Sequence, residues 1–226
     1  MSFSVVLFDV DGTLVDSVDS HTRSWQEAFD HFGKHVAFDA IRAQLGKGGD
    51  VIVPHFLSPR EVAAIGDKLE RFRSEIFKRN YMTLVRPFPR VRDLLERLVG
   101  DGVKCVLASS AKEAELKHYI EICRIGELIA AQTTYDDIDK SKPSSDVFPA
   151  AIAKVGAPPV AKVRVVGDSP WDVVAAHHSS LACISLLCGG FAEADLKRAG
   201  ATSIFRDPAD VLESYQRFRA TPELNE

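Results

Sequence analysis

The sequence has few cysteines, no long apolar run and no cluster of basic residues. Its four cysteines, Cys105, Cys123, Cys183 and Cys188, form no C-x-x-C pair, so we interpret them as small core residues of a protein in the reducing cytoplasm. The apolar run near the N-terminus is short, follows no basic segment and stops at Asp9, which fits neither a signal peptide nor a transmembrane helix. A net charge of −4 without a basic patch argues against a nucleic-acid partner. We therefore expect a monomeric cytoplasmic protein that binds neither nucleic acid nor membrane.

The sequence does contain a regular alternation of short apolar runs and helical patterns, and its 226 residues suffice for a hydrophobic core. The runs SVVLFD, VKCVLAS, VRVVGD and LACISLL predict strands that are buried on both faces, as in a parallel sheet. Residues 91–102, 112–123 and 146–156 have the spacing of helices between those strands. This order predicts an α/β fold with a doubly wound, Rossmann-like parallel sheet.

Residues 17–84 interrupt this alternation, because they contain helical patterns and no convincing strand. A helical block inserted after the first strand leaves the sheet at its carboxyl edge, where doubly wound folds bind ligands. We therefore predict an all-α cap domain at 17–84 on a core of 1–16 and 85–226. The connections at 15–19 and 85–87 are the expected hinges.

Two amphipathic stripes predict the main helices of the insertion. The first ends before Gly33 and the second begins at Ser58, where Pro59 and Glu61 complete the pattern of a capping box. The apolar positions of the two stripes are Trp25, Ala28, Phe29 and Phe32, and Val62, Ile65, Leu69, Phe72 and Ile76.

Two carboxylates follow the first predicted strand. Asp9 and Asp11 stand two residues apart, so in extended chain they point to the same side, and Gly12 permits a sharp turn. Two adjacent carboxylates repel each other, and Mg²⁺ is the usual ion that such groups share with a phosphate. A carboxylate can also attack phosphorus to form an acyl phosphate. The alternative, a solvated acidic turn, is less specific than a buried strand that ends in D-x-D-G-T.

Hydroxyl groups follow the second predicted strand. Ser110 and Glu113 have the spacing of a capping box, which leaves the Ser109 hydroxyl beside the free N–H groups of a helix N-terminus. That combination binds phosphate, so Ser109 and Ser110 are candidate phosphate ligands. The alternative is that these serines only cap the helix.

Two later segments supply a lysine and two further aspartates. Lys142 is the better candidate of two lysines for neutralising a phosphate, because Pro143 stiffens its loop; Ser145 or Asp146 is the expected cap of the next helix. Asp168 ends another predicted strand and suits the same metal. Asp172 has capping-box spacing from Ser169, so it serves either the helix start or the outer shell of the metal.

Together these segments resemble the haloacid dehalogenase superfamily over nearly the whole chain. The resemblance lies in Asp9-Val10-Asp11-Gly12-Thr13, Ser109, Lys142-Pro143 and Gly167-Asp168, in that order. The insertion resembles a C1-type cap, and TLVDS, ASSAK and KPSSDVF resemble the subgroup of β-phosphoglucomutase-like and phosphoglycolate-phosphatase-like enzymes. The chain departs from the usual pattern at Ser145, where proline is common, and at Ser180, where glycine is common.

The resemblance implies a role for each motif residue. It makes Asp9 the nucleophile and Asp11 the general acid and base, which also offers its backbone carbonyl to Mg²⁺. It assigns Ser109 and Lys142 to the transferring phosphoryl group and makes Asp168 complete the metal shell. Phosphoryl transfer of this kind depends on positioning and charge neutralisation.

Substrate choice is expected to reside in the predicted cap. His21 follows Asp9 by twelve residues and resembles a cap histidine of the mutase-like group, and Lys47 lies between glycines in a loop resembling the specificity loop of C1 caps. Both are candidate substrate-binding residues. The alternative is that the glycines only join two helices and that Lys47 is solvated.

The leading interpretation is a Mg²⁺-dependent phosphatase that acts on a small phosphorylated metabolite. A sugar-phosphate mutase uses the same aspartyl-phosphate and differs in whether a sugar hydroxyl or water accepts the phosphoryl group. A non-catalytic phospho-accepting module is disfavoured by the insertion and by the acid at Asp11. A dehalogenase or phosphonate hydrolase of this superfamily is disfavoured because those branches lack the second acidic residue.

Overall fold

A computed structural model of the protein describes residues 3–137, 141–144 and 147–224. The chain divides into two units, each with its own interior. Met1–Asp16 and Arg86–Glu226 form the first, called here the α/β unit, and Ser17–Val85 forms the second, called the helical unit. That the helical unit acts as a cap remains a proposal.

Parallel strands form the centre of the α/β unit, in a six-stranded sheet among the described residues with the order β5-β4-β1-β6-β7-β8. The pairing is in register from Val5 against Lys104 and Val163 to Phe8 against Leu107 and Val166. The strands of this sheet are β1 (Val5–Phe8), β4 (Lys104–Ala108), β5 (Ile129–Thr133), β6 (Val163–Gly167), β7 (Ala182–Leu186) and β8 (Ser203–Phe205). The chain adds strands to one side of β1 and then to the other, which confirms the predicted doubly wound class.

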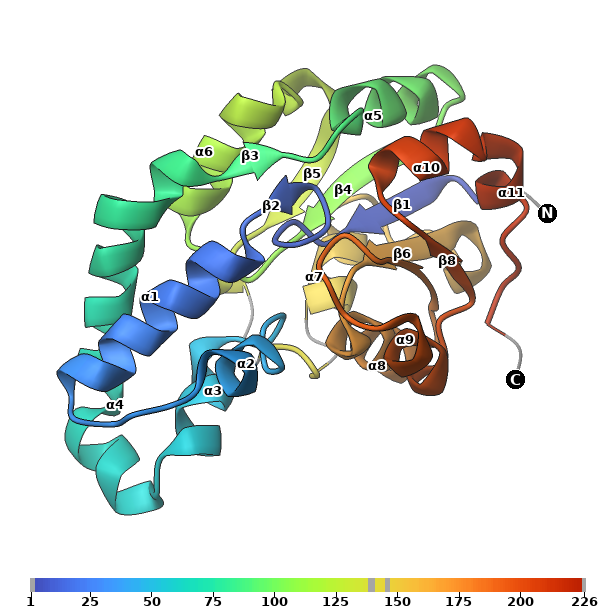
Figure 1. The fold of residues 1–226 in the computed structure, drawn as a ribbon. Helices are drawn as coiled ribbons and strands as arrows, with labels where there is room; N and C mark the ends of the chain where they lie inside the picture. The colour runs from blue at the N-terminus through green and yellow to red at the C-terminus, as the bar shows by residue number, and fades with distance from the viewer. Residues whose placement is uncertain (1–2, 138–140, 145–146, 225–226) are drawn as a thin grey trace. The chain divides into compact units, whose positions relative to one another are not determined.

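Helices cover both faces of this sheet. Figure 1 shows α5, α6 and α10 on one side and α7, α8 and α9 on the other. The helices of the α/β unit are α5 (Val91–Gly100), α6 (Glu113–Cys123), α7 (Val147–Ala153), α8 (Pro170–His178), α9 (Glu193–Ala199), α10 (Pro208–Glu213) and α11 (Tyr215–Arg219). The strands present side chains to both helical layers, so β1, β6 and β7 are buried at every position. This double burial explains their largely apolar sequences.

One apolar core lies between the sheet and helices α7 and α8. It includes Leu7 of β1, Val165 of β6, Phe148 of α7 and Val173 of α8, each of which is 0% exposed. The polar ends of the same strands therefore lie on a rigid, close-packed support.

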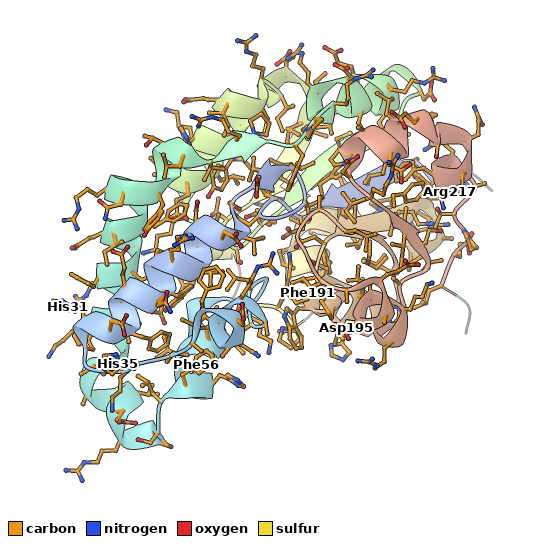
Figure 2. The ribbon with its side chains drawn as sticks, in the orientation of Figure 1. His31, His35, Phe56, Phe191, Asp195 and Arg217 are labelled. Atoms are coloured by element: carbon orange, nitrogen blue, oxygen red, sulfur yellow. The ribbon has the colours of Figure 1, made fainter. Side chains whose placement is uncertain are left out.

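The C-terminal helix packs against the α/β unit through aromatic and guanidinium groups. Arg217, labelled in Figure 2, places its guanidinium 3.8 Å from the ring centroid of Phe205. Arg164 is buried on β6, where its guanidinium donates to the carbonyls of Val163 and Thr221. The segment after α11 is thus tied to the sheet at Thr221.

The helical unit contains α1 (Val18–His31), α2 (Phe38–Arg42), α3 (Gly49–Phe56) and α4 (Pro59–Ile76), followed by a π-helical turn at Phe77–Tyr81. Its core joins Trp25 and Phe29 of α1 to Leu69 of α4, as the two predicted stripes require. The predicted capping box is present, since Glu61 accepts hydrogen bonds from the Ser58 N–H (2.9 Å) and hydroxyl (2.7 Å).

Polar side chains occupy the outer surface of this unit. Figure 2 shows His31 and His35 around the end of α1, where His35 Nδ1 lies 2.7 Å from Asp30 Oδ1. His31 stacks on Phe72 of α4 with ring centroids 3.9 Å apart. No helix among the described residues is long and apolar enough to cross a membrane.

Two short strands lie where the chain passes between the units. β2 (Val15–Asp16) and β3 (Arg86–Pro87) pair antiparallel, with Val15 opposite Pro87 and Asp16 opposite Arg86. The Phe88 N–H also donates to the Leu14 carbonyl at 3.0 Å. Both crossings are therefore joined by backbone hydrogen bonds within the α/β unit.

Candidate active site

The carboxyl ends of the parallel strands bring the sequence motifs together. Asp9 follows β1, Ser109 follows β4 and Asp168 follows β6, and these three strands are neighbours in the sheet. The Asp9 N–H donates to the Val166 carbonyl at 2.8 Å, which fixes the first motif against the last strand residues of β6. The direction in which the chain adds strands to the sheet reverses next to β1, so the edge at Asp9 is the expected ligand site of a doubly wound sheet.

A buried lysine links two of the aspartates. Lys142 is 2% exposed, its Nζ pairs with Asp9 Oδ1, and it lies 2.7 Å from Asp172 Oδ1. A buried ammonium group is tolerable only beside opposite charge, and the two carboxylates provide it. The sequence predicted Lys142 for a phosphate, and here it also holds the carboxylate of the predicted nucleophile.

Thr13 connects the first and last acidic motifs. Its Oγ1 lies 3.0 Å from Asp9 Oδ2 and 3.0 Å from Asp168 Oδ1, and the side chain is fully buried. The single hydroxyl proton can be donated to only one of these carboxylates at a time. Thr13 therefore fixes the spacing of Asp9 and Asp168. The role of Thr13 was not predicted from the sequence, although a hydroxyl two residues after Asp11 in D-x-D-G-T was the available signal.

Three buried carboxylates form a cluster that suits a divalent cation. One oxygen from each of Asp9, Asp168 and Asp172 lies within 4.8 Å of the other two, and this set is called the acidic cluster. Hard oxygen donors in this number fit Mg²⁺. The cluster has more carboxylates than the single Lys142 ammonium can neutralise, and that charge excess is the observation that favours a cation there.

The electrostatics of the acidic cluster show the same imbalance. Burial raises the pKa of Asp9, Lys142 opposes this effect, and Asp172 and Asp11 add to it. Burial, followed by the charges of Asp9 and Asp172, also raises the pKa of Asp168. Burial alone would lower the pKa of Lys142, but the carboxylates of Asp172 and Asp9 outweigh it and raise the pKa. Lys142 is thus held as a cation, while the carboxylates of Asp9 and Asp168 resist full ionisation without further positive charge.

Asp172 both caps a helix and contacts the lysine. Its Oδ2 accepts from the Ser169 N–H at 3.1 Å and hydroxyl at 2.6 Å, while its own N–H donates to Ser169 Oγ. The predicted capping box at the start of α8 is therefore confirmed. The second oxygen faces Lys142, a contact that sequence spacing could not reveal because 30 residues of chain separate the two.

Asp11 contributes no side-chain oxygen to the acidic cluster. It is partly exposed and forms an isolated backbone bridge with Val15, inside the turn made by Gly12, whose φ of 85° requires glycine. The predicted metal set was Asp9, Asp11 and Asp168, whereas the side-chain oxygens that come together belong to Asp9, Asp168 and Asp172. The resemblance assigns the backbone carbonyl of Asp11 to the metal, and that assignment remains a prediction.

The two serines after β4 differ in their surroundings. Ser109 is 2% exposed, its Oγ accepts from the Ala111 N–H at 3.0 Å, and its own N–H donates to Thr133 Oγ1 at 3.2 Å. The predicted capping box of Ser110 and Glu113 is wrong, because α6 begins at Glu113 with Lys112 as its N-cap and no side-chain cap. The Ser109 hydroxyl accepts a hydrogen bond within the loop, and α6 begins only at Glu113. Ser110 therefore lies outside the first helical turn.

Two candidate substrate-binding residues belong to the helical unit. His21 is 4% exposed and stacks on Phe77 with ring centroids 3.9 Å apart and planes at 8°. Lys47 is partly buried between α2 and α3, and its Nζ donates to Gln44 Oε1 at 2.6 Å. Burial lowers the pKa of Lys47. Their roles remain predictions, and the predicted caps Ser145 and Asp146 lie outside the described residues.

Comparisons with known proteins agree with this arrangement. Residues 6–186 match the family described as haloacid dehalogenase-like hydrolase. The chain is 30% identical over 195 residues to a phosphoglycolate phosphatase of Pseudomonas savastanoi pv. phaseolicola, covering 82% of this chain and 70% of that protein. It is 27% identical to the pyrophosphatase PpaX of Oceanobacillus iheyensis, covering 80% and 82%. The crystal structure of a hydrolase from Pseudomonas syringae superimposes on this chain with a TM-score of 0.87 at 29% identity. The match covers 96% of this chain and 100% of that protein chain.

Proposed function

Because the chain belongs to the haloacid dehalogenase-like hydrolase family, we propose that it is a Mg²⁺-dependent phosphatase acting on a small phosphorylated metabolite. The observation that carries this proposal is the buried pairing of Lys142 with Asp9 beside the acidic cluster. It provides a nucleophile, a cation for the phosphoryl oxygens and carboxylates for a metal. The similarity to proteins named phosphoglycolate phosphatase and pyrophosphatase supports phosphoryl chemistry.

The proposed first step forms a bond between Asp9 and phosphorus. The Asp9 carboxylate attacks the phosphate monoester, the bond to the leaving oxygen breaks, and Asp11 gives that oxygen a proton. Lys142 and the Ser109 hydroxyl hold the phosphoryl oxygens as charge shifts onto them. The products of this step are an aspartyl-phosphate and the free alcohol.

The proposed second step returns Asp9 to its starting state. Asp11, now a carboxylate, takes a proton from a water molecule, and the resulting hydroxide attacks phosphorus. The acyl-phosphate bond breaks, inorganic phosphate forms and the Asp9 carboxylate is regenerated. Asp11 suits both roles because its side chain lies outside the acidic cluster and is partly exposed.

Asp9, Asp168 and the backbone carbonyl of Asp11 would hold Mg²⁺, with Asp172 beside them. Bound Mg²⁺ would neutralise negative charge on the phosphoryl group and on the carboxylates. Asp172 already pairs with Lys142 and caps α8, so we expect Asp168→Ala to weaken Mg²⁺ binding more than Asp172→Ala. Calorimetric titration of both variants with Mg²⁺ measures the difference.

We also propose that the helical unit is a cap that opens and closes over the reaction, with His21 and Lys47 contacting the substrate. The paired strands β2 and β3 at the two crossings support hinges at 15–19 and 85–87. Closure would exclude water from the first step. Solution scattering with and without a phosphate analogue should show a change of dimensions, and identical curves would count against a moving cap.

The function is tested by measuring phosphate release across a panel of phosphorylated metabolites, with Mg²⁺ and with a chelator. The proposal predicts release from at least one small monoester that stops when the metal is removed. A mutase would instead convert a hexose 1-phosphate into the 6-phosphate with little free phosphate. Full activity after thorough chelation would exclude the proposed metal.

A further inference from the structure

The loop after β7 lies against the proposed metal ligand Asp168. β7 is the neighbour of β6, with Ser185 opposite Gly167, so residues 187–190 leave the sheet beside Asp168. A Cβ atom placed on Gly189 would lie 1.7 Å from Asp168 Oδ2 and 2.4 Å from Asp168 Cγ. Real Cβ atoms do not approach other atoms so closely, so the carboxylate occupies the space that a side chain at 189 would need.

The backbone conformation of Gly189 is not the reason for glycine there. Its φ lies outside the left-handed region, whereas the next residue, Gly190, has φ of 84° and needs glycine for its conformation. An alanine at 189 would therefore meet a steric conflict with Asp168 rather than a strained backbone.

The loop is also anchored at its start. The Leu187 N–H donates to the carbonyls of Phe205 (3.0 Å) and Arg206 (3.1 Å), and the Gly190 N–H donates to the Leu187 carbonyl at 2.9 Å. The two bonds from Leu187 tie the start of the loop to the end of β8, and the bond from Gly190 closes the loop on itself. It therefore cannot easily withdraw from Asp168 when the space between them is filled.

The same loop contacts the first motif through Cys188. Cys188 Sγ lies 3.2 Å from the carbonyl oxygen of Gly12, in the turn that carries Thr13. Burial and the negative charges of Asp168 and Asp207 raise the pKa of this thiol, so it keeps the proton that it donates. Thr13 in turn contacts both Asp9 and Asp168. The loop thus contacts Asp168 directly through Gly189, and through Cys188 it contacts the turn that orients Thr13.

We propose that the loop of residues 187–190 positions Asp168 for Mg²⁺, because Gly189 packs directly against the Asp168 carboxylate and Cys188 bonds to the Gly12 turn. This inference rests on the proposed function, because it treats Asp168 as a metal ligand. Gly189 and Cys188 are positioning residues that contact neither substrate nor metal in this account. Groups that orient metal ligands in this manner typically change affinity by about 10–100-fold when altered.

The test compares Mg²⁺ binding by Gly189→Ala and by the control Gly100→Ala. Gly100 also has an ordinary φ, and a Cβ there meets nothing within 4 Å. Calorimetric titration should show a Kd for Mg²⁺ raised about 10–100-fold in Gly189→Ala and unchanged in Gly100→Ala. The proposal is overturned if folded Gly189→Ala binds Mg²⁺ as tightly as the wild type.

Introducing Gly189→Ala into an Asp168→Gly variant distinguishes a conflict with Asp168 from a general loss of stability. Asp168→Gly removes the side chain that conflicts with a Cβ at 189. Without metal, Gly189→Ala should lower Tm clearly in the wild-type chain and much less in Asp168→Gly. An equal loss of Tm in both backgrounds would overturn the proposal.

If Gly189→Ala does not fold, two variants of Cys188 test the proposal instead. Cys188→Ala removes the donor to the Gly12 carbonyl and should weaken Mg²⁺ binding by about threefold, while Cys188→Ser keeps a donor and should stay near the wild type. Wild-type affinity in both variants would contradict the proposal. None of these readouts needs a substrate, so a wild-type protein that binds Mg²⁺ but releases no phosphate would refute the proposed function alone.

Discussion

The two units of the chain bury different kinds of side chain. Among the described residues, all the buried charged groups belong to the α/β unit: Asp9, Glu115, Lys142, Arg164, Asp168 and Asp172. The buried polar groups of the helical unit are a histidine and small hydroxyls: Ser17, His21, Thr22, Ser24 and Ser74. Buried charge costs stability, so the α/β unit tolerates a cost that the helical unit avoids.

This difference in buried side chains distinguishes residues that serve the chemistry from residues that pack a core. In the helical unit, Trp25, Phe29 and Leu69 form an aromatic and aliphatic core, and Arg73 lies 4.9 Å from the Trp25 ring centroid at its margin. Removing a core side chain there should cost stability and leave catalysis intact. Removing a residue of the acidic cluster in the α/β unit should instead impair catalysis and leave stability intact. The predictions below test that division.

The largest effect is expected for Lys142→Ala. The substitution leaves Asp9 and Asp172 without their buried cation, so kcat should fall on the order of 100-fold or more. Phosphate-release kinetics measure the change. The matched control is Lys154→Ala, which removes a more exposed lysine that pairs with Asp137. Similar losses in both variants would argue against a special role for Lys142.

The second largest effect is expected for Leu69→Ala in the helical unit. Leu69 is 0% exposed in the core of that unit, and its truncation should cost about 2–5 kcal/mol of unfolding free energy. Denaturant titration gives the free energy, with Leu84→Ala as the control, since Leu84 is 60% exposed. A fall in kcat at a temperature where Leu69→Ala is fully folded would break the division between the units.

The dependence of stability on pH should reveal the acidic cluster without any substrate. Burial raises the pKa of Asp9 from 3.8 to about 7. An acid with a raised folded-state pKa costs no stability below its unfolded pKa, and the cost grows as pH rises toward the folded value. In the metal-free protein the contribution of Asp9 should therefore decline between about pH 4 and pH 7. Asp168, whose pKa is also raised, should act in the same direction.

Mg²⁺ should remove this cost, because it binds the ionised carboxylates. The difference in Tm with Mg²⁺ and with a chelator should therefore increase with pH over the same range. Differential scanning fluorimetry across buffers measures it, and the difference cancels contributions from carboxylates remote from the metal. A Tm difference that stays constant with pH would contradict the cluster as the binding site.

The smallest effect is expected for Ser180→Gly. Ser180 has φ of 56°, in the left-handed region that a side chain disfavours. Glycine should relieve that strain and raise stability by less than about 1 kcal/mol, since its greater freedom in the unfolded chain offsets part of the gain. Ser179→Gly is the control, because Ser179 has φ of −100° and should gain nothing.

The sequence predicted the central strands because burial on both faces leaves a continuous apolar run. It did not predict β5 and β8, which lie at the two edges of the sheet and are only partly buried. An edge strand has one neighbour and less apolar contact, so its sequence carries a weaker signal.

The candidate site was predictable wherever a strand end placed a motif, as at Asp9, Ser109 and Asp168. The contacts of Lys142 with Asp172 and of Cys188 with Gly12 were not, because they join segments whose distance in space depends on the whole sheet. The false capping box at Ser110 has a local cause. Spacing alone cannot tell that the chain turns once more before α6 begins at Glu113.

The most direct test of the central claim is to find the residue that receives the phosphoryl group. The wild type and Asp9→Asn are mixed with Mg²⁺ and a substrate identified from the metabolite panel, quenched in acid within one turnover and digested for mass spectrometry. The proposed mechanism predicts a hydroxylamine-sensitive phosphoryl group on the wild-type peptide that contains Asp9. It also predicts neither label nor turnover in a folded Asp9→Asn. Wild-type turnover in Asp9→Asn, or the phosphoryl group on another residue, would contradict it.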